Sequence, residues 1–211
     1  MAKLELIATS TFGLEAVVKR EVEALGYKIL QSENGKISFL GDERAVAKAN
    51  IWLRCADRVQ IKLAEFEAKT FTELFEQTKA LPWEQWIPMD GQINVSGSSV
   101  KSQLHSVPAC QGMVKKAIIE KLKETYFIEE FPETGLPFAL KVTILKDRVT
   151  LTLDTTGETP NFGTKVGESA EFAAQFIGKT GPFTLGAGVD GISGATITSE
   201  AAVEAINNAI K

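Results

Sequence analysis

Two polar stretches of this sequence hold side chains able to bind or react with a ligand. In Ser98–Gln111, four serines, a lysine, a histidine and a cysteine fall within 14 positions. In Ser193–Ser199 (SGATITS), the hydroxyls of Thr196, Thr198 and Ser199 fall within four positions. Each stretch is a loop of small residues that leads into a predicted helix. Because the N-terminus of a helix presents free N–H groups and the positive end of its dipole, both loops are candidates for phosphate binding.

The first loop is followed by a predicted helix with a basic surface. Ser106 is placed to cap this helix, Pro108 lies in its first turn, and the helix should end near Thr125. From Ser98 to Lys123 there are five lysines and one acid, Glu120. Lysines beside a polar loop suit contacts with a phosphate backbone. The alternative is a capped helix whose lysines are only solvated. The residues expected to face inward are Val114, Ala117, Ile118 and Leu122.

The histidine and the cysteines do not form a recognisable catalytic or metal site. His105 is the single histidine of the chain and is expected to be a surface or capping residue. Cys110 lies in the first turn of a helix, which could lower the pKa of its thiol, but no base follows nearby, so we expect a structural role. Cys55 and Cys110 belong to no CxxC motif, and the composition makes a zinc site improbable. Reduced cysteines indicate a cytoplasmic protein.

The composition is that of an ordinary globular protein. The chain has 211 residues, of which 44% are hydrophobic and 24% charged, with a formal net charge of −4. Residues 1–157 contain 20 Lys and Arg against 21 Asp and Glu, whereas residues 158–211 contain 3 against 6. The acidic excess at the end of the chain does not favour contact with RNA. No apolar run approaches the length needed to cross a membrane, and no signal-peptide pattern is present, so no membrane partner is expected.

The first 66 residues predict a β-α-β-β-α-β unit. Apolar periodicity and turn residues set the order of the elements. Glu33-Asn34-Gly35 is a hairpin signal, because Gly35 can adopt positive φ. This order is typical of a ferredoxin-like fold. The predicted elements are strand Leu4–Ala8, helix Gly13–Leu25, strands Lys28–Leu30 and Lys36–Phe39, helix Glu43–Cys55 and strand Arg58–Phe66.

A second unit follows from Thr70. It should begin with a helix over Phe71–Lys79, and Trp83 and Trp86 should hold the next segment on the core; base stacking by these rings is the alternative. A strand over Gln92–Gly97 precedes the polar loop. Leu140–Gly163 then begins as a hairpin, with apolar residues alternating up to Leu153 and a turn at Lys146-Asp147. It ends in a turn-forming Thr-Thr-Gly-Glu-Thr-Pro cluster.

Four motifs occur in the order seen in one enzyme family. They are Thr11–Glu15, Thr78–Trp83, Lys101–Gln111 and Ile144–Asp147. Residues 1–157 resemble the N-terminal half of the large-subunit rRNA guanine-N2 methyltransferases that carry a THUMP domain. This resemblance implies a ferredoxin-like domain followed by a THUMP domain that binds structured RNA, in particular rRNA. The implied RNA-binding residues are Lys101, Ser102, His105, Lys115 and Lys116.

After Gly157 the catalytic motifs of that family do not follow. There is no Asn-Pro-Pro-Tyr motif and no glycine-rich loop after a strand, so no S-adenosylmethionine site is expected in this chain. Instead, Glu158–Gly163 and Asp190–Thr196 resemble parts of the FMN-binding domain of sodium-pumping NADH:quinone reductase subunits. In that family a flavin transferase attaches FMN to the threonine that matches Thr196. The resemblance therefore implies an electron-transfer flavoprotein site formed by Glu158, Thr159, Gly163, Ser193, Gly194, Ala195 and Thr196.

These observations predict an α+β fold: a ferredoxin-like domain at 1–68, a THUMP-like domain at 69–157 and an FMN-binding-domain-like segment at 158–211. The main expected function is RNA binding by an rRNA methyltransferase-like protein without a catalytic domain in this chain. A covalent FMN carrier is the alternative. A third possibility is a mosaic of two unrelated genes without a joint activity. The hairpin Val142–Leu153 is expected to join the sheet of the preceding domain, with the residues from Glu158 onward packed against that sheet.

Overall fold

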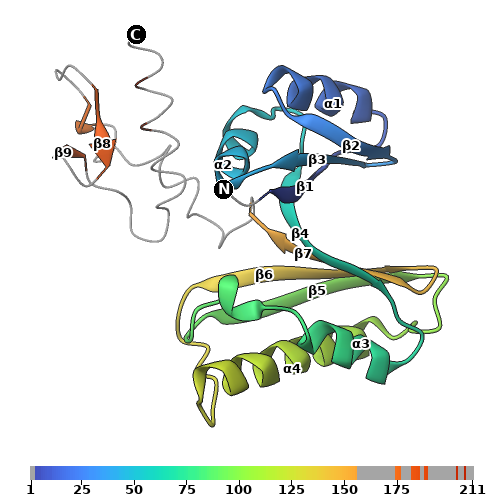
Figure 1. Cartoon of the computed structure of the whole chain (residues 1–211). Helices are drawn as coiled ribbons and strands as arrows, with labels where there is room; N and C mark the ends of the chain where they lie inside the picture. Colours follow the sequence, from blue (N-terminus) through green and yellow to red (C-terminus); the bar gives the residue numbers. More distant parts are fainter. Residues whose placement is uncertain are drawn as a thin grey trace. The chain divides into compact units, whose positions relative to one another are not determined.

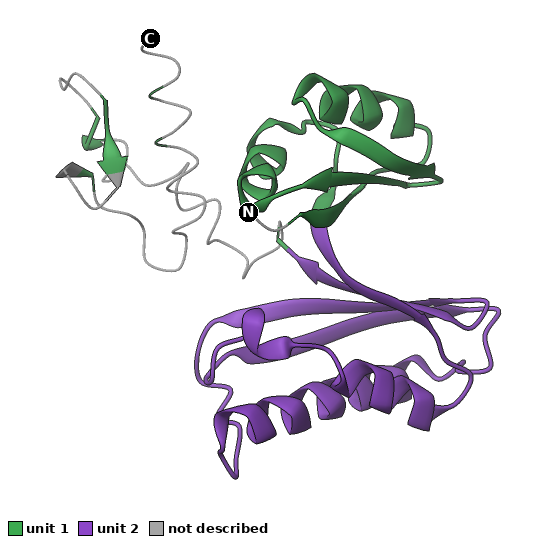
Figure 2. Cartoon of the chain, in the orientation of Figure 1, with its two compact units in different colours: residues 1–59, 155–211 green, residues 60–154 purple. Residues whose placement is uncertain are grey.

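The computed structural model describes residues 3–155, 174–176, 182–185, 188–189, 203 and 207. The chain divides into two compact units, Met1–Val59 with Thr155–Lys211, and Gln60–Asp154 (Figure 2). The domain boundaries expected at 68 and 157 remain predictions. Among the described residues no helix has the length and apolar character required to cross a membrane, and no group of three or more His, Cys, Asp or Glu could hold a metal ion. The predicted flavin-site residues lie outside the described residues: Glu158, Thr159, Gly163, Ser193, Gly194, Ala195 and Thr196.

The first unit has the predicted order of elements (Figure 1). Its strands and the start of β4 lie in the order β2-β3-β1-β4, and β3 pairs antiparallel with both β1 and β2. This is the split β-α-β arrangement of a ferredoxin-like fold, so the fold prediction is confirmed. The elements are β1 (Leu4–Thr9), α1 (Glu15–Ala24), β2 (Lys28–Glu33), β3 (Lys36–Gly41), α2 (Glu43–Trp52) and β4 (Arg58–Glu67).

The core of the first unit comes from alternating strand residues and one face of each helix. Gly35, with φ 71°, forms the β2–β3 turn as predicted. The helix α2 ends at Trp52, before the predicted end at Cys55, because Leu53 is extended and the Glu21 carboxylate accepts the next two N–H groups, those of Arg54 and Cys55. Side chains with no exposed surface include Leu6, Val18, Val22, Ile37, Phe39 and Ala49.

The second unit is a four-stranded sheet with helices on one face, in the strand order β4-β7-β6-β5 (Figure 1). β5 and β6 are parallel, and the other pairs are antiparallel. The helix α4 packs on both α3 and β5. All four residues expected to face inward from α4 are buried. The elements after β4 are α3 (Phe71–Lys79), the short 3-10 helix η1 (Trp83–Gln85), β5 (Gln92–Val100), α4 (Val107–Tyr126), β6 (Pro137–Leu145) and β7 (Arg148–Asp154).

The β6–β7 hairpin is an integral part of this sheet. Its turn residues, Lys146 and Asp147, have φ of 52° and 63°, as a tight two-residue hairpin turn requires. β6 pairs with β5 along its other edge, and β7 pairs with β4. The prediction that the hairpin joins the preceding domain is therefore confirmed. Trp83, 1% exposed, donates its indole N–H to the Thr78 carbonyl at 2.7 Å, which confirms that this ring packs on the core.

A few residues near the end of the chain are also described. Thr184–Leu185 (β8) pairs in parallel with Gly188–Val189 (β9). The Asn207 side chain accepts from the Phe183 N–H and donates to the Phe183 carbonyl, both at 2.7 Å. Asn207 lies in a helical position, in the region where the last helix was predicted.

Candidate nucleic-acid interface

The polar loop after β5 is held in place by the β6–β7 turn. The Ser102 hydroxyl and the Gln103 backbone N–H both donate to Oδ1 of Asp147 at 2.7 Å. The backbone of the turn also takes part, because Lys146 N–H donates to the Val100 carbonyl at 3.1 Å. One aspartate therefore orders the start of a loop that is 45 positions away in sequence.

These contacts favour the ionised form of Asp147. The Gln103 N–H, followed by the Ser102 hydroxyl, holds the pKa of the Asp147 carboxyl below its ordinary value. The predicted site residue Ser102 is thus occupied by an internal hydrogen bond in this conformation. The turn at Asp147 was predictable from the sequence, but its connection to the loop was not, because nothing local to either segment signals it.

The interior of the loop is built around Leu104. Its carbonyl accepts from the Ser99 hydroxyl at 2.6 Å and lies 3.7 Å from Sγ of Cys110. Cys110 is buried, and this burial raises the pKa of its thiol, which opposes formation of a thiolate nucleophile. The structure thus favours the expected structural role of Cys110.

Ser106 and His105 lie where the sequence placed them, at the end of the loop. Ser106 is the N-cap residue of α4, but its side chain makes no capping hydrogen bond. His105 is exposed, and its Nδ1 lies 3.0 Å from the Gln103 carbonyl. Lys101 is also exposed and has a positive φ of 52°. Three of the five predicted RNA-binding residues, Lys101, Ser102 and His105, therefore share this loop.

The other two predicted residues lie on α4 and are paired with acids. Lys115 Nζ is 2.8 Å from Oε1 of Glu133. Lys116 Nζ lies 3.9 Å from Oε1 of Glu120 and 5.9 Å from the centroid of the Phe75 ring. Lys115 is eight residues beyond the start of α4, which corresponds to roughly 12 Å along the helix axis. The structure does not bring the two groups of predicted residues together in one cluster.

Glu133 connects Lys115 to the outer edge of the sheet. Its carboxylate accepts the Ile93 backbone N–H at 3.0 Å as well as pairing with Lys115. Desolvation opposes its ionisation, but the hydrogen bonds from Lys115 and Ile93 outweigh it, so the pKa of Glu133 is lowered. Because β5 is the last strand of its sheet, Glu133 covers part of an otherwise open strand edge.

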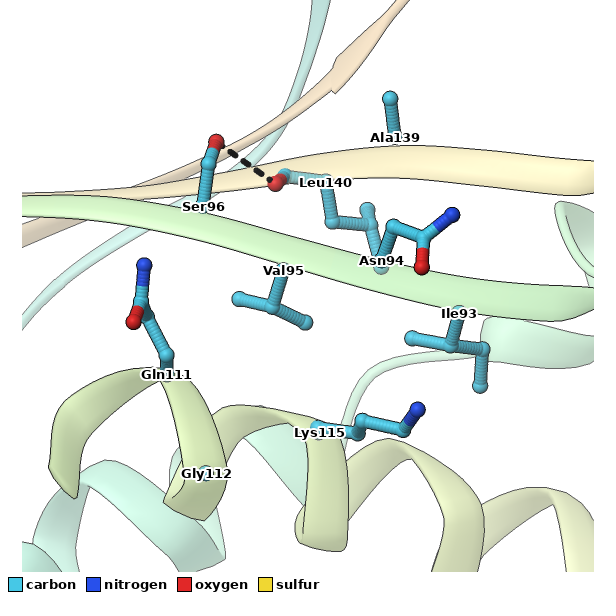
Figure 3. A pocket seen from close by; sticks show the side chains of 9 residues that line it. All are labelled: Ile93, Asn94, Val95, Ser96, Gln111, Gly112, Lys115, Ala139 and Leu140. Carbon is cyan, nitrogen blue, oxygen red and sulfur yellow. Dashed lines mark hydrogen bonds between the residues drawn. The ribbon is translucent and has the colours of Figure 1, made fainter. Parts of the chain in front are cut away.

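A shallow groove of about 410 Å³ runs between β5 and the first half of α4 (Figure 3). At Gly112 an added Cβ would meet nothing within 4 Å, so this side of the groove is open. Ser96 donates to the Leu140 carbonyl at 3.2 Å, whereas Lys115 provides a cation at the helix side. This groove was not among the features predicted from the sequence, although polar residues at alternate positions of β5 were a usable signal. The lining residues are Ile93, Asn94, Val95, Ser96, Gln111, Gly112, Lys115, Ala139 and Leu140.

Three family models match this chain. Residues 5–60 match the RlmL ferredoxin-like domain, and residues 68–154 match the THUMP domain. Residues 135–211 match the FMN-binding domain. The last two matches overlap over residues 135–154, which include the whole β6–β7 hairpin.

Relatives match about three quarters of the chain. A putative RNA methyltransferase of Bacillus subtilis, YpsC, is 50% identical over 74% of this chain and 41% of its own length. The ribosomal RNA large subunit methyltransferase K/L of Syntrophotalea carbinolica is 27% identical over 74% of this chain and 22% of its own. The crystal structure of a possible methylase from Clostridium difficile 630 matches with a TM-score of 0.72 at 46% identity, over 74% of this chain and 42% of that protein. The chain thus spans less than half the length of these relatives. It has a ferredoxin-like region and a THUMP-like region, and over the matched part it is similar to RNA methyltransferases and methylase-like proteins.

Proposed function

We propose that this chain recognises structured RNA, in particular rRNA, through the segment 98–111 and the lysines of α4. This segment comprises the end of β5, the loop 101–106 and the start of α4. The observation that carries the proposal is the polar loop, which contains no acidic residue and is fixed by hydrogen bonds to Asp147. The loop leads into a lysine-bearing helix within the residues that match the THUMP domain. Ordered polar groups and lysines are suited to phosphate contacts. The names of two relatives, the putative RNA methyltransferase YpsC and the ribosomal RNA large subunit methyltransferase K/L, support RNA as the ligand.

A filter-binding titration with a labelled rRNA stem-loop at several salt concentrations tests this proposal. Contacts with phosphates release counterions, so the logarithm of the binding constant should fall linearly with the logarithm of salt concentration. Replacing the three lysines of the site, Lys101, Lys115 and Lys116, by alanine should reduce this slope by up to about three. An affinity that does not depend on salt concentration, or that is the same for wild type and the triple variant, overturns the proposal.

The matched control removes lysines from the first unit. Lys3 and Lys28 are exposed and belong to the ferredoxin-like part of the chain. For each lysine removed, Lys3→Ala with Lys28→Ala should reduce the salt slope by less than the triple variant does. Equal losses per lysine for both sets of variants would show attraction by net charge rather than recognition at this surface.

A covalent FMN carrier is the second candidate, and the family-model match over residues 135–211 favours it. A flavin transferase would join FMN to Thr196 as a phosphoester: the Thr196 hydroxyl would attack the flavin-side phosphorus of a flavin adenine dinucleotide, the P–O–P bond would break, and AMP would leave while the hydroxyl proton is released. The flavin would supply electron-transfer chemistry when bound. Co-expression with such a transferase, followed by intact mass measurement, tests the proposal. A mass increase that is absent in Thr196→Ala supports it. No increase in wild type, or an increase that survives in Thr196→Ala, contradicts it.

The pairing of the β6–β7 hairpin bears on this second candidate. Both of its outer edges are already paired, β6 with β5 and β7 with β4. A flavin domain that includes residues 135–154 would therefore have to form on a hairpin without a free edge. This favours RNA recognition as the main function and keeps open a mosaic chain in which the final residues add no joint activity. The proposal also includes a cytoplasmic location, which the free cysteines Cys55 and Cys110 favour.

A further inference from the structure

We propose that Lys146 on the β6–β7 turn, together with Lys101, forms the main phosphate-contacting pair of this chain. The ligand class is the phosphodiester backbone of RNA, so the inference rests on the proposed RNA-binding function and specifies where its charge is provided. The sequence predicted Lys146 as a turn residue but not as an RNA-binding residue. Its involvement follows from the place of the turn in the fold.

The two lysines lie at the same end of the second unit. In the parallel β5–β6 pair, Val100 is the register partner of Leu145, so the residues that follow each strand emerge side by side. The Lys146 N–H donates to the Val100 carbonyl at 3.1 Å, which attaches the turn to the residue directly before Lys101. Two segments 45 positions apart thus present neighbouring cations.

Both lysines are presented by an unusual and well-held backbone. Lys101 and Lys146 each have φ 52°, in the left-handed region that residues other than glycine rarely adopt. Hydrogen bonds of Asp147 to Ser102 and Gln103 connect the residues that follow each lysine. Preorganisation of this kind lowers the entropic cost of ordering the site when a ligand binds.

The charges of this pair are available to a ligand. Lys101 and Lys146 are both exposed, and in the described part of the chain neither has a carboxylate within ion-pair distance. Nearby acids are engaged elsewhere: the Asp147 carboxylate accepts from the loop, and Glu67 pairs with Lys69 at 2.8 Å. By contrast, Lys115 has to leave Glu133 before it can contact a phosphate. A lysine that is already paired with a carboxylate gains less free energy from contact with a phosphate, because the existing ion pair must first be broken.

The experiment compares two single variants in the full chain, with the same labelled rRNA stem-loop and salt series. Lys146→Gln removes one cation from the pair, and Lys116→Gln removes one from the paired set on α4. Lys146→Gln should weaken binding at low salt and reduce the salt slope by about one. Lys116→Gln should change the slope by less, and Lys146→Arg should restore the wild-type slope. Thermal unfolding of each variant verifies that it folds.

The outcomes separate this inference from the proposed function. If wild type binds with a normal salt dependence and Lys146→Gln keeps the full slope, the pair is refuted and RNA recognition stands. If Lys116→Gln reduces the slope more than Lys146→Gln does, the α4 lysines carry the contact and the pair is again refuted. If wild type fails to bind the stem-loop at low salt, both proposals fall.

Discussion

The Ser102 hydroxyl donates to the Asp147 carboxylate at 2.7 Å, across 45 positions of sequence. This bond joins the polar loop after β5 to the β6–β7 hairpin in the sheet of the second unit. The same hairpin lies within the residues that match the FMN-binding family model. The hydrogen bond therefore assigns the hairpin a role in the candidate RNA-binding surface, in addition to its role in the sheet.

Removing the charge of Asp147 should loosen this loop in a pH-dependent way. Asp147→Asn keeps a residue that tolerates positive φ but loses the charge-assisted bonds to Gln103 and Ser102. Since the pKa of Asp147 is lowered in the folded state, its stabilisation is present above the unfolded pKa of about 3.9 and is lost as pH falls through the folded value. Thermal unfolding from pH 7 to pH 2 should show a lower Tm for the variant at neutral pH and convergence in acid.

The control for this series is Asp57→Asn, at an exposed aspartate of the first unit. At neutral pH the Tm of Asp57→Asn should lie closer to the Tm of wild type than the Tm of Asp147→Asn does. A Tm difference between Asp147→Asn and wild type that persists unchanged at pH 2 would show that the loss has another cause than the ionised carboxylate.

Trp83 should contribute strongly to the stability of the second unit. Its ring is 1% exposed, and its indole N–H donates to the Thr78 carbonyl at 2.7 Å. Trp83→Phe loses that donor and leaves a void, so urea denaturation should show a loss of about 1–3 kcal/mol. Trp52→Phe, at a ring that is 55% exposed, is the comparison and should change the free energy of unfolding by less than about 0.5 kcal/mol. Equal effects would contradict the burial of Trp83.

Phe127 ends α4 in the left-handed conformation that glycine favours. Its φ is 56°, and its side chain is 94% exposed, so burial does not compensate the strain. Phe127→Gly should raise the free energy of unfolding by up to about 1 kcal/mol, because relief of the Cβ clash exceeds the entropy gained by the unfolded chain. Phe127→Ala keeps the Cβ and should be close to neutral. A destabilised glycine variant would show that the exposed ring has a structural contact.

Glu21 should be important for the first unit because it joins α1 to the segment after α2. Its carboxylate accepts from the Arg54 N–H at 3.1 Å, the Arg54 Nε at 3.2 Å and the Cys55 N–H at 3.3 Å. Glu21→Gln should cost about 1–2 kcal/mol in chemical denaturation. Glu23→Gln removes only the exposed pair with Lys19 at 3.9 Å and should cost about 0–0.5 kcal/mol. Similar losses for both variants would refute the bridging role of Glu21.

The secondary structure of the described domains was largely predictable, because local patterns specify it. Alternating apolar residues predicted the strands, and Gly35 and Lys146-Asp147 predicted the two hairpin turns. The ends of elements were less predictable. β5 extends to Val100, beyond the predicted Gly97, since its pairing with β6 continues through Ser98 and Ser99, two residues with weak strand propensity.

The candidate site was predictable only in part. Local composition indicated the segment 98–111 and the lysines of the helix that follows it. Helical periodicity predicted that these lysines lie on the outer face of α4. Three features depended on contacts between distant segments: Asp147 as the acceptor for the loop, Lys146 beside Lys101, and Glu133 as the partner of Lys115. Hydrophobic periodicity indicates which face of a helix or strand is buried. The partner of a charged surface residue depends instead on strand order and register, which bring distant segments together. The amino-acid sequence thus specified the elements, the polar loop and the lysine-bearing helix, and the folded sheet determined which lysines are paired with acids and which are not.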